Sequence, residues 1–538
     1  MQGHRHHRQL GLVDQSGLES LNLHLSGDGG MIVTTLAQIE QMGACQVSAG
    51  GHVSVDLEPS SDIALHSWQL PVQGLSKWHE VVNILNVQHG LTRTATPNSI
   101  HLHFRSRKVW NETSSDLQVT VWNGRGVLSD FPLLFEEDPE INNTLIDASI
   151  EIAACAVALQ QVLLQQGIIR SISANDRWLT LSVRIDDVPP EAAVDMFSSE
   201  YGPGTATALP DSSGSLLRFR VPLEYTPPEM LRILEHPCTE SGTLIPNGWM
   251  SISPIPVEIC DGIVSDHPAK LPAQLESLNA VVLGAGGLGS WAAPLLAKGV
   301  ELANFDLTLI DGDDAVDEHN LNRQVLYKVS DIGFPKATQS AKRLASLFGD
   351  CSSIHGIHSR LESNHIFEPE DIHELDTVSL DSLFDDFSDT TSEQIKIALK
   401  KMDVGLACLD NMNSRTLFNR ACIDRDAIFI NGGGEAFEGL VEILDSNVCM
   451  TCRYGEESAR SREVISCQEV GTRPVASIVT TTAWTGAMQA ALALLASAER
   501  RELLSADWFK GLDFNMGRIQ PRVIGRLPWI QGKCKSHA

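Results

Sequence analysis

The sequence is short of cations, of aromatic residues and of long apolar runs. Its 538 residues contain 40 Lys+Arg against 68 Asp+Glu, a formal net charge of −28, and only 6% aromatic residues. Because such an acid excess repels phosphate backbones and anionic lipids, we expect no nucleic-acid partner and no membrane surface. The charge suits a basic protein partner, and solubility alone would also explain it.

Targeting and cross-linking signals are also lacking. No uninterrupted apolar run reaches the roughly 18 residues that a membrane span needs. The N-terminal MQGHRHHRQLGL is basic, but no apolar core of signal-peptide length follows it, which predicts a cytoplasmic protein. The 11 cysteines are odd in number and scattered, unlike a secreted disulfide framework. The length exceeds the roughly 250–300 residues of a single core and predicts several domains.

The second half opens with a glycine-rich turn in the setting of a nucleotide-binding fold. An apolar run over 281–283 leads into the turn, a helical stretch follows, and a β-type run over 305–310 ends in Asp311. The turn contains Gly284, Gly286, Gly287 and Gly289. This order lets phosphate approach backbone amides at a helix N-terminus. The glycine spacing alone is a weak signal and would equally predict an NAD or FAD dehydrogenase.

Two cations and a second carboxylate follow the glycine turn. Arg323 lies in the segment NLNRQ (320–324), Lys336 ends the segment GFPK (333–336), and Asp410 lies in Leu-Asp-Asn (409–411). A dinucleotide enzyme has no reason to gather two cations, whereas a triphosphate does, and a carboxylate suits its magnesium. Either cation alone would be interpreted as solvated surface charge. The ordered set favours ATP.

These motifs resemble the ubiquitin-activating enzyme superfamily, which includes the ThiF-like adenylyltransferases and the activating enzymes for ubiquitin-like proteins. The motifs stand in family order over residues 278–538. The resemblance implies that a C-terminal glycine carboxylate attacks the α-phosphate of ATP, giving an acyl-adenylate and pyrophosphate. It assigns ribose to Asp313, phosphates to Asn320, Arg323 and Lys336, and magnesium to Asp410. The expected nucleotide-binding set is Gly284, Gly286, Gly287, Gly289, Asp311, Asp313, Asn320, Arg323, Gln324, Lys336, Asp410 and Asn411, with Arg323 and Lys336 also catalytic.

Clustered cysteines near the C-terminus predict a structural zinc site. Cys449 and Cys452 form a CxxC pair, whose spacing lets two thiolates reach one tetrahedral metal. Cys534 and His537 would complete a Cys₃His set. Many family members use a second CxxC pair instead, so His537 departs from that pattern. A redox dithiol and two unmetallated pairs are the alternatives.

Cys467 is the candidate acyl acceptor. It lies in ISCQEVGTRP (465–474), before a helix predicted over 476–499. Enzymes that activate ubiquitin-like proteins place their thioester cysteine in the loop before this helix. A helix N-terminus and Arg473 would lower the thiol pKa. Pathway adenylyltransferases can carry a cysteine here without forming a thioester. We interpret Cys408 and Cys422, which lie in apolar contexts, as buried packing residues.

The first half repeats the second in weakened form. Gly27, Gly29 and Gly30 align with the first three glycines of the turn, but Ile32 replaces the fourth and Ser54 replaces Asp311. This pattern predicts an internal repeat that kept its fold and lost its site. The resemblance implies an inactive adenylation-type domain over 1–170, paired as a pseudo-dimer with an active domain over 269–538, in a monomer or a homodimer.

Arg8 and the middle of the chain carry weaker predictions. In the family an early arginine reaches the partner domain's triphosphate, and the matching residue is Arg8, although a basic tail explains it equally well. Residues 171–268 are expected to form a small α+β domain of β-α-β-β-α-β order, either a substrate platform or a spacer. Its expected strands are 178–185, 205–209, 214–223 and 248–258, and its expected helices are 190–200 and 227–235. Residues 361–395 hold 11 Asp+Glu without Lys or Arg, which predicts an exposed acidic insertion.

The sequence therefore predicts an α/β enzyme with two Rossmann-like adenylation domains, the first degenerate, and a zinc site in the second. It would use ATP, Mg²⁺ and Zn²⁺ to adenylate a ubiquitin-like protein and then form a thioester on Cys467 for a conjugating enzyme. The compact layout resembles activating enzymes of bacterial antiphage systems. The alternatives are a sulfur-carrier-protein or peptide adenylyltransferase without a thioester step, a scaffold with a decayed site, and an NAD oxidoreductase. Intact Arg323, Lys336 and Asp410 argue against the last two.

Overall fold

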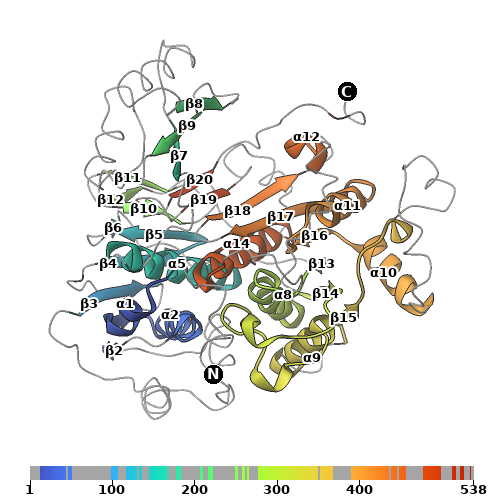
Figure 1. Ribbon diagram of the computed structural model, residues 1–538, viewed down its shortest axis with the longest axis horizontal. Coiled ribbons are helices and arrows are strands. Elements are labelled where there is room, and N and C mark those ends of the chain that lie inside the picture. The colour runs from blue at the N-terminus through green and yellow to red at the C-terminus, as the bar shows by residue number, and fades with distance from the viewer. Residues whose placement is uncertain are drawn as a thin grey trace.

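The computed structural model describes the strands and helices of both halves of the chain (Figure 1). The described residues are 13–43, 46–50, 99–106, 115, 117–129, 133–135, 144–166, 168, 177–182, 206–209, 216–221, 249–252, 257–260, 263–265, 277–348, 352–366, 389–435, 438–444, 448–455, 477–497, 512–515, 522–525 and 534.

The second half is built on an eight-stranded sheet in the order β15-β14-β13-β16-β17-β18-β19-β20. Its parallel strands are β13 (Asn279–Leu283), β14 (Asp306–Asp311), β15 (Ile354–His358), β16 (Val404–Ala407) and β17 (Ile428–Glu435). The antiparallel strands are β18 (Glu438–Leu444), β19 (Leu512–Asn515) and β20 (Arg522–Gly525). Strands β13, β14 and β16 are almost fully buried, as expected of parallel strands covered on both faces of the sheet.

Helices cover this sheet on both faces. They are α8 (Gly289–Ala303), α9 (Lys336–Phe348), α10 (Asp389–Lys401), α11 (Met412–Ile423), α12 (Met450–Tyr454) and α14 (Val479–Ser497), with 3-10 turns η2 (Glu318–Asn320), η3 (Val329–Asp331) and η4 (Ser363–His365). β13 pairs with β14 on one side and β16 on the other. The chain therefore reverses its winding direction at β13, and open α/β sheets bind ligands in a crevice at the carboxyl ends of the strands at such a point.

The first half has a six-stranded sheet whose central strands follow the same order, without a described counterpart of β15 or β20. It runs β10-β5-β4-β3-β1-β2, with β1 (Asn22–Gly27), β2 (Gln46–Gly50), β3 (Ile100–Arg105), β4 (Leu117–Trp122), β5 (Arg125–Ser129) and β10 (Trp249–Ser251). β1 lies between parallel β2 and β3 as β13 lies between β14 and β16. β4 then extends the parallel set and β5 returns antiparallel, as β17 and β18 do. The prediction of an α/β fold with Rossmann-like parallel sheets is confirmed.

The two halves meet at their longest helices. α5 (Thr144–Gln165) packs along α14 at the centre of the molecule (Figure 1), with α1 (Gln15–Ser20) and α2 (Gly29–Met42) on the first-half side. One hydrophobic cluster contains buried residues from α2, α5, α8 and α14. Leu145–Leu163 is long and apolar enough to cross a membrane, but this whole window is buried within the protein, which is typical of a core helix. The small-residue composition of α5 and α14 therefore serves close packing.

The middle segment departs from the expected order. β7 (Arg177–Ser182), β8 (Ala206–Leu209) and β9 (Leu216–Val221) form an antiparallel sheet in the order β7-β9-β8. The strand expected over 248–258 does not join them, because β10 pairs with β5 of the first sheet instead. β11 (Glu258–Cys260) and β12 (Ile263–Ser265) form a small sheet with β6 (Leu134–Phe135). Hence residues expected in the 171–268 unit extend the sheets of the first half.

The expected helices of the middle segment and most of the expected acidic insertion fall outside the described residues. The helices expected over 190–200 and 227–235 lie outside the described residues, as do residues 367–388 of the acidic insertion. The expected insertion does not extend unbroken to residue 395, because Asp389–Lys401 forms α10. The side chains of Ile395 and Leu399 are fully buried, so this helix packs on the domain rather than standing in solvent.

Candidate nucleotide site and cysteine cluster

The glycine turn occupies residues 284–288, between β13 and α8. Gly284 has φ +99°, and a Cβ atom there would lie 2.5 Å from the Cys408 carbonyl oxygen, at the end of the neighbouring β16. A Cβ on Gly289 would overlap the Gly284 carbonyl oxygen. Only glycine fits both positions, because a side chain would push the turn away from β16 or from α8. The turn therefore presents bare backbone at the N-terminus of α8, as phosphate binding requires.

Asp311 fixes the shape of this turn from the end of β14. Its Oδ2 accepts the Ala285 N–H at 2.6 Å, and its Oδ1 accepts the Asp313 N–H at 2.8 Å. The side chain is buried, and burial raises the pKa of Asp311, while Lys336 and the two backbone donors oppose that rise. The carboxylate thus joins the glycine turn to the segment that follows β14.

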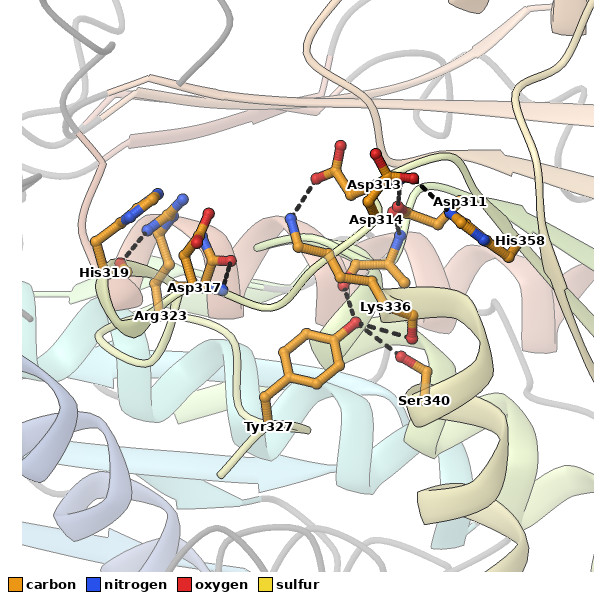
Figure 2. Close-up of polar contacts among 12 residues, drawn as sticks. Asp311, Asp313, Asp314, Asp317, His319, Arg323, Tyr327, Lys336, Ser340 and His358 are labelled. Atoms are coloured by element: carbon orange, nitrogen blue, oxygen red, sulfur yellow. Dashed lines mark hydrogen bonds and ion pairs between the residues drawn. The ribbon is translucent and has the colours of Figure 1, made fainter. Parts of the chain in front are cut away.

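Lys336 begins α9 and points at Asp313 (Figure 2). Its Nζ forms an ion pair with Asp313 Oδ2; the lysine side chain is 8% exposed and the aspartate side chain 48%. The Tyr327 hydroxyl, next to the start of α9, donates to the Ala285 carbonyl at 2.7 Å and shares a hydrogen bond with Ser340 Oγ at 2.8 Å. Burial raises the pKa of Tyr327 well above its ordinary value, so the hydroxyl stays neutral. Sequence reasoning missed Tyr327, because a lone aromatic in an apolar run gives no signal.

The NLNRQ segment packs directly against the glycine turn. Arg323 Nη1 donates to the His319 carbonyl and to Asn322 Oδ1, both at 2.9 Å, while Trp291 Nε1 of α8 donates to the Arg323 carbonyl at 3.1 Å. Cβ atoms on Gly287 and Gly286 would lie 3.8 Å from Arg323 Cδ and 3.7 Å from Gln324 Nε2. Both side chains therefore border the turn.

Asn320 has a structural task in the same segment. Its Oδ1 accepts the Asp317 N–H at 3.0 Å, closing a capping box on η2. A phosphate contact would consequently fall to its Nδ2 group, since an amide nitrogen is a donor.

The third strand end brings Asp410 to the crevice. Asp410 is exposed two residues beyond Cys408, whose carbonyl abuts Gly284. Asn411 Oδ1 accepts the Ser414 N–H at 2.7 Å and so caps α11, a role that the sequence did not predict for it. Arg415 of α11 donates to the Leu409 carbonyl and, at 2.8 Å, to Asn431 Oδ1. An exposed carboxylate at a strand end can supply the oxygen ligand that magnesium prefers.

The thiols of Cys449, Cys452 and Cys534 converge on one point. Cys449 Sγ lies 3.8 Å from Cys452 Sγ and 3.8 Å from Cys534 Sγ, and the Cys534 N–H approaches Cys452 Sγ at 3.3 Å. A tetrahedral metal with sulfur bonds of about 2.3 Å sets sulfur–sulfur edges of about 3.8 Å, so the spacing fits zinc. Burial raises the pKa of Cys449 to about 11, so the thiol keeps its proton at neutral pH. A metal ion that binds the sulfur must displace that proton.

Three predicted site residues, Cys467, His537 and Arg8, lie outside the described residues. Cys408 and Cys422 are buried as predicted, and burial raises the pKa of the Cys408 thiol to about 12. Such a thiol is neutral at physiological pH and is no candidate nucleophile.

The matching position in the first half is closed by a carboxylate. β1 ends at Gly27, which matches Gly284 in its positive φ and in its close approach to a carbonyl of the neighbouring strand. α2 begins at Gly29, so Asp28 alone stands where residues 285–288 stand in the second half. Asp28 Oδ1 accepts the Met31 N–H at 3.0 Å and Oδ2 accepts Ser106 Oγ at 2.6 Å. This buried side chain occupies the helix N-terminus where a phosphate would bind.

A glycine turn at a strand end, with two cations and acidic side chains beside it, is an arrangement typical of nucleotide-binding α/β domains. Residues 264–522 match the ThiF family model, and the chain therefore contains a ThiF-family domain.

Several curated enzymes are similar to part of the chain. The sulfur carrier protein ThiS adenylyltransferase of Escherichia coli (strain K12) is 28% identical over 226 residues, which are 41% of this chain and 74% of that enzyme. The adenylyltransferase and sulfurtransferase UBA4 of Lodderomyces elongisporus is 30% identical over 37% of this chain and 36% of its own length. The SAMP-activating enzyme E1 of Haloferax volcanii is 27% identical over 34% of this chain and 56% of its own length. Thus the chain spans only about a third to a half of the last two enzymes.

Among solved structures, Escherichia coli MccB bound to MccA-N7isoASN aligns with a TM-score of 0.32 and 18% identity. The alignment covers 47% of this chain and 66% of that one.

Proposed function

We propose that this chain activates a ubiquitin-like protein by ATP-dependent adenylation of its C-terminal glycine. The observation that carries the proposal is the convergence of Asp311, Arg323 and Lys336 on the glycine turn of a ThiF-family domain. The activating enzymes and adenylyltransferases among the relatives support this reaction class. The cytoplasm is the proposed location.

The adenylation would be accelerated mainly by positioning of the reactants and by neutralisation of charge on the phosphates. The amides of the glycine turn receive phosphate, and Arg323 and Lys336 offset the charge that moves onto pyrophosphate as the α-phosphate bond to the β-phosphate breaks. Lys336 must exchange its ion pair with Asp313 for phosphate, which frees that carboxylate for ribose. Asp410 would hold Mg²⁺, which supplies further neutralisation of the triphosphate when bound. The glycine carboxylate is itself the nucleophile, so no general base is required.

We propose an inactive role for the first half, residues 1–170, as a pseudo-partner of the active domain, residues 269–538. The shared order of its central strands and the Asp28 carboxylate at the helix N-terminus support this assignment. The α5–α14 contact would be the pseudo-dimer interface. Arg8 is proposed to reach the triphosphate across it, and residues between the halves to form a platform or spacer.

The second step we propose is a thioester on Cys467. Thr482, in the first turn of α14, packs against Gly287, so α14 begins beside the glycine turn. Only nine residues separate Cys467 from Ser477, the first described residue before that helix. The thiolate would attack the adenylated carbonyl carbon, forming a C–S bond and expelling AMP, and a conjugating enzyme would then take the acyl group. Zinc on Cys449, Cys452, Cys534 and His537 would hold the C-terminal end.

The second candidate is adenylation of a sulfur-carrier protein without a thioester step. The identity to the ThiS adenylyltransferase favours it, because 74% of that enzyme is aligned. By resemblance alone, the two-repeat layout favours a bacterial antiphage pathway for the first candidate.

ATP–pyrophosphate exchange with candidate substrate proteins separates the two. We expect the full chain with Mg²⁺ to catalyse exchange and to form a DTT-sensitive adduct that Cys467→Ala abolishes while exchange persists. Exchange without an adduct in the wild type would establish the second candidate. Absence of both exchange and ATP binding would reject both.

A further inference from the structure

A buried carboxylate outside the nucleotide site contacts the helix that carries the cysteine cluster. Glu442 on β18 is 1% exposed. Its Oε2 accepts Arg453 Nε at 2.9 Å, and its Oε1 accepts the Tyr454 hydroxyl. Arg453 and Tyr454 end α12, a short helix that begins after Cys449 and contains Cys452. The orientation of α12 is therefore fixed at one end by the thiols and at the other by Glu442.

The same carboxylate is linked to the loop of Asp410. Glu442 Oε1 also accepts Asn431 Nδ2 at 2.9 Å, and Asn431 Oδ1 accepts Arg415 Nη1 at 2.8 Å. The second terminal nitrogen of Arg415 donates to the Leu409 carbonyl, one residue before Asp410. Asn431 and Arg415 are both buried. A continuous chain of hydrogen bonds thus joins the cysteine helix to the Leu409 carbonyl, one residue before the proposed magnesium ligand Asp410.

This chain of hydrogen bonds has one internal orientation. The Asn431 amide oxygen accepts from the Arg415 guanidinium and its nitrogen donates to the Glu442 carboxylate. A flipped amide would place donor against donor at Arg415 and acceptor against acceptor at Glu442. The buried Arg453 guanidinium pairs with Glu442, whose charge also favours the charged form of the buried Arg415, so displacement of Glu442 removes a buried counter-charge from both cations. A second tie runs in parallel, since the Met450 N–H donates to Asn419 Oδ1 of α11 at 2.9 Å.

We propose that Glu442 is a positioning residue that couples metal binding at the cysteine cluster to Mg·ATP binding at Asp410. A metal that holds Cys449 and Cys452 fixes α12, and Arg453 and Tyr454 then hold Glu442 and the Asp410 loop in their binding geometry. Coupling of this kind is reciprocal, so bound Mg·ATP must tighten metal binding by the same factor. The inference deepens the proposed function and rests on it.

Zinc affinity tests the coupling without any turnover. The zinc-loaded full chain is titrated with a chromophoric chelator, with and without saturating Mg²⁺ and an ATP analogue bearing a methylene bridge between the α- and β-phosphates. We expect the analogue to raise zinc affinity about tenfold in the wild type, within the range usual for such coupling. Glu442→Gln should abolish the increase. Tyr454→Phe, which removes one hydroxyl and keeps the ring, should reduce it and serves if the first variant fails to fold.

Asp403→Asn is the matched control. Asp403 lies at the opposite end of β16 from Asp410, where its Oδ2 accepts two hydrogen bonds from Asn279, at 2.8 and 2.7 Å. Its variant loses a partly buried carboxylate but should keep the full tenfold effect. Wild-type protein that binds the analogue with no change in zinc affinity would overturn the coupling and leave the proposed function standing. Failure of the zinc-loaded wild type to bind the analogue at all would overturn both.

Discussion

At the scale of single residues, Lys336 has the most demanding position in the crevice. Its ammonium is nearly buried, it pairs with a half-exposed carboxylate, and Tyr327 and Ser340 fix the first turn of the helix that begins with it. This pre-organisation holds the cation in place before nucleotide binds. An electrostatic group placed in advance contributes more to a reaction than one that must be ordered during it.

Lys336→Ala should therefore reduce ATP–pyrophosphate exchange by about 10²–10³-fold, the loss typical of removing one preorganised donor. The reason is that the charge transferred to pyrophosphate loses a buried counter-ion. Lys342→Ala removes an exposed lysine from the same helix and should leave the exchange rate unchanged. Equal rates for Lys336→Ala and the wild type would remove Lys336 from the phosphate site.

Residues with local signals were predictable, and residues whose partners lie far along the chain were not. The glycine turn, Asp311 and Lys336 stand in short motifs, and the structure brings them together. Glu442 gave no signal, because a single acid in a β-type run resembles a solvent-facing position, and its partners Arg453 and Tyr454 lie on the next element, α12, at no motif spacing. The structural tasks of Asn320 and Asn411 were missed because capping depends on where a helix begins.

At the scale of elements, α5 and α14 were expected over 145–167 and 476–499 and were found at 144–165 and 479–497. Their small, apolar residues predict buried helices whatever the partner. The partner of β10 could not be predicted, since pairing with β5 spans more than a hundred residues and leaves no periodic trace. The same limit hid the stripe of His24, His101 and His103 on neighbouring β1 and β3.

These histidines should make stability depend on pH. Ser26 Oγ lies 2.6 Å from His101 Nε2 and 2.8 Å from His103 Nδ1, and the His24 and His101 rings are 4.8 Å apart. Burial lowers the pKa of His24, and the charge of His101 lowers it further. The unfolded chain therefore takes up a proton at higher pH than the folded one. The contribution of His24 to the free energy of unfolding should be fully present above pH 6.5 and should decrease as the pH falls below it.

Urea unfolding at pH 7.5, 6.5 and 5.5 measures this slope. His24→Gln keeps a hydrogen-bonding group facing Ser48 but cannot take up the proton, so its free energy of unfolding should fall less between pH 6.5 and 5.5 than that of the wild type. His355→Gln replaces an exposed histidine on β15 and should keep the wild-type slope. Identical slopes in all three proteins would contradict the assignment to His24.

At the scale of the whole molecule, the two halves share one hydrophobic core rather than touching across a polar surface. Buried residues of both sheets belong to a single cluster, and one buried hydrogen bond crosses between the longest helices. Thr480 Oγ1 of α14 donates to Gln160 Oε1 of α5 at 2.8 Å, and both side chains are fully buried. Halves joined in this way are expected to unfold together.

The Thr480–Gln160 bond tests that expectation. Thr480→Val leaves Gln160 Oε1 without its donor and should lower the free energy of unfolding by about 1–3 kcal/mol. Adding Gln160→Leu should restore most of the loss, because the Gln160 Nε2 has no hydrogen-bond partner in the described structure and would be removed as well. Thr485→Val is the control, since that hydroxyl bonds only within its own helix, to the Thr481 carbonyl at 2.8 Å. Urea unfolding gives the energies, and hydrogen exchange locates them: Thr480→Val should weaken protection in α5 and α14 alike. Loss of protection confined to α14 would mean that the halves unfold separately.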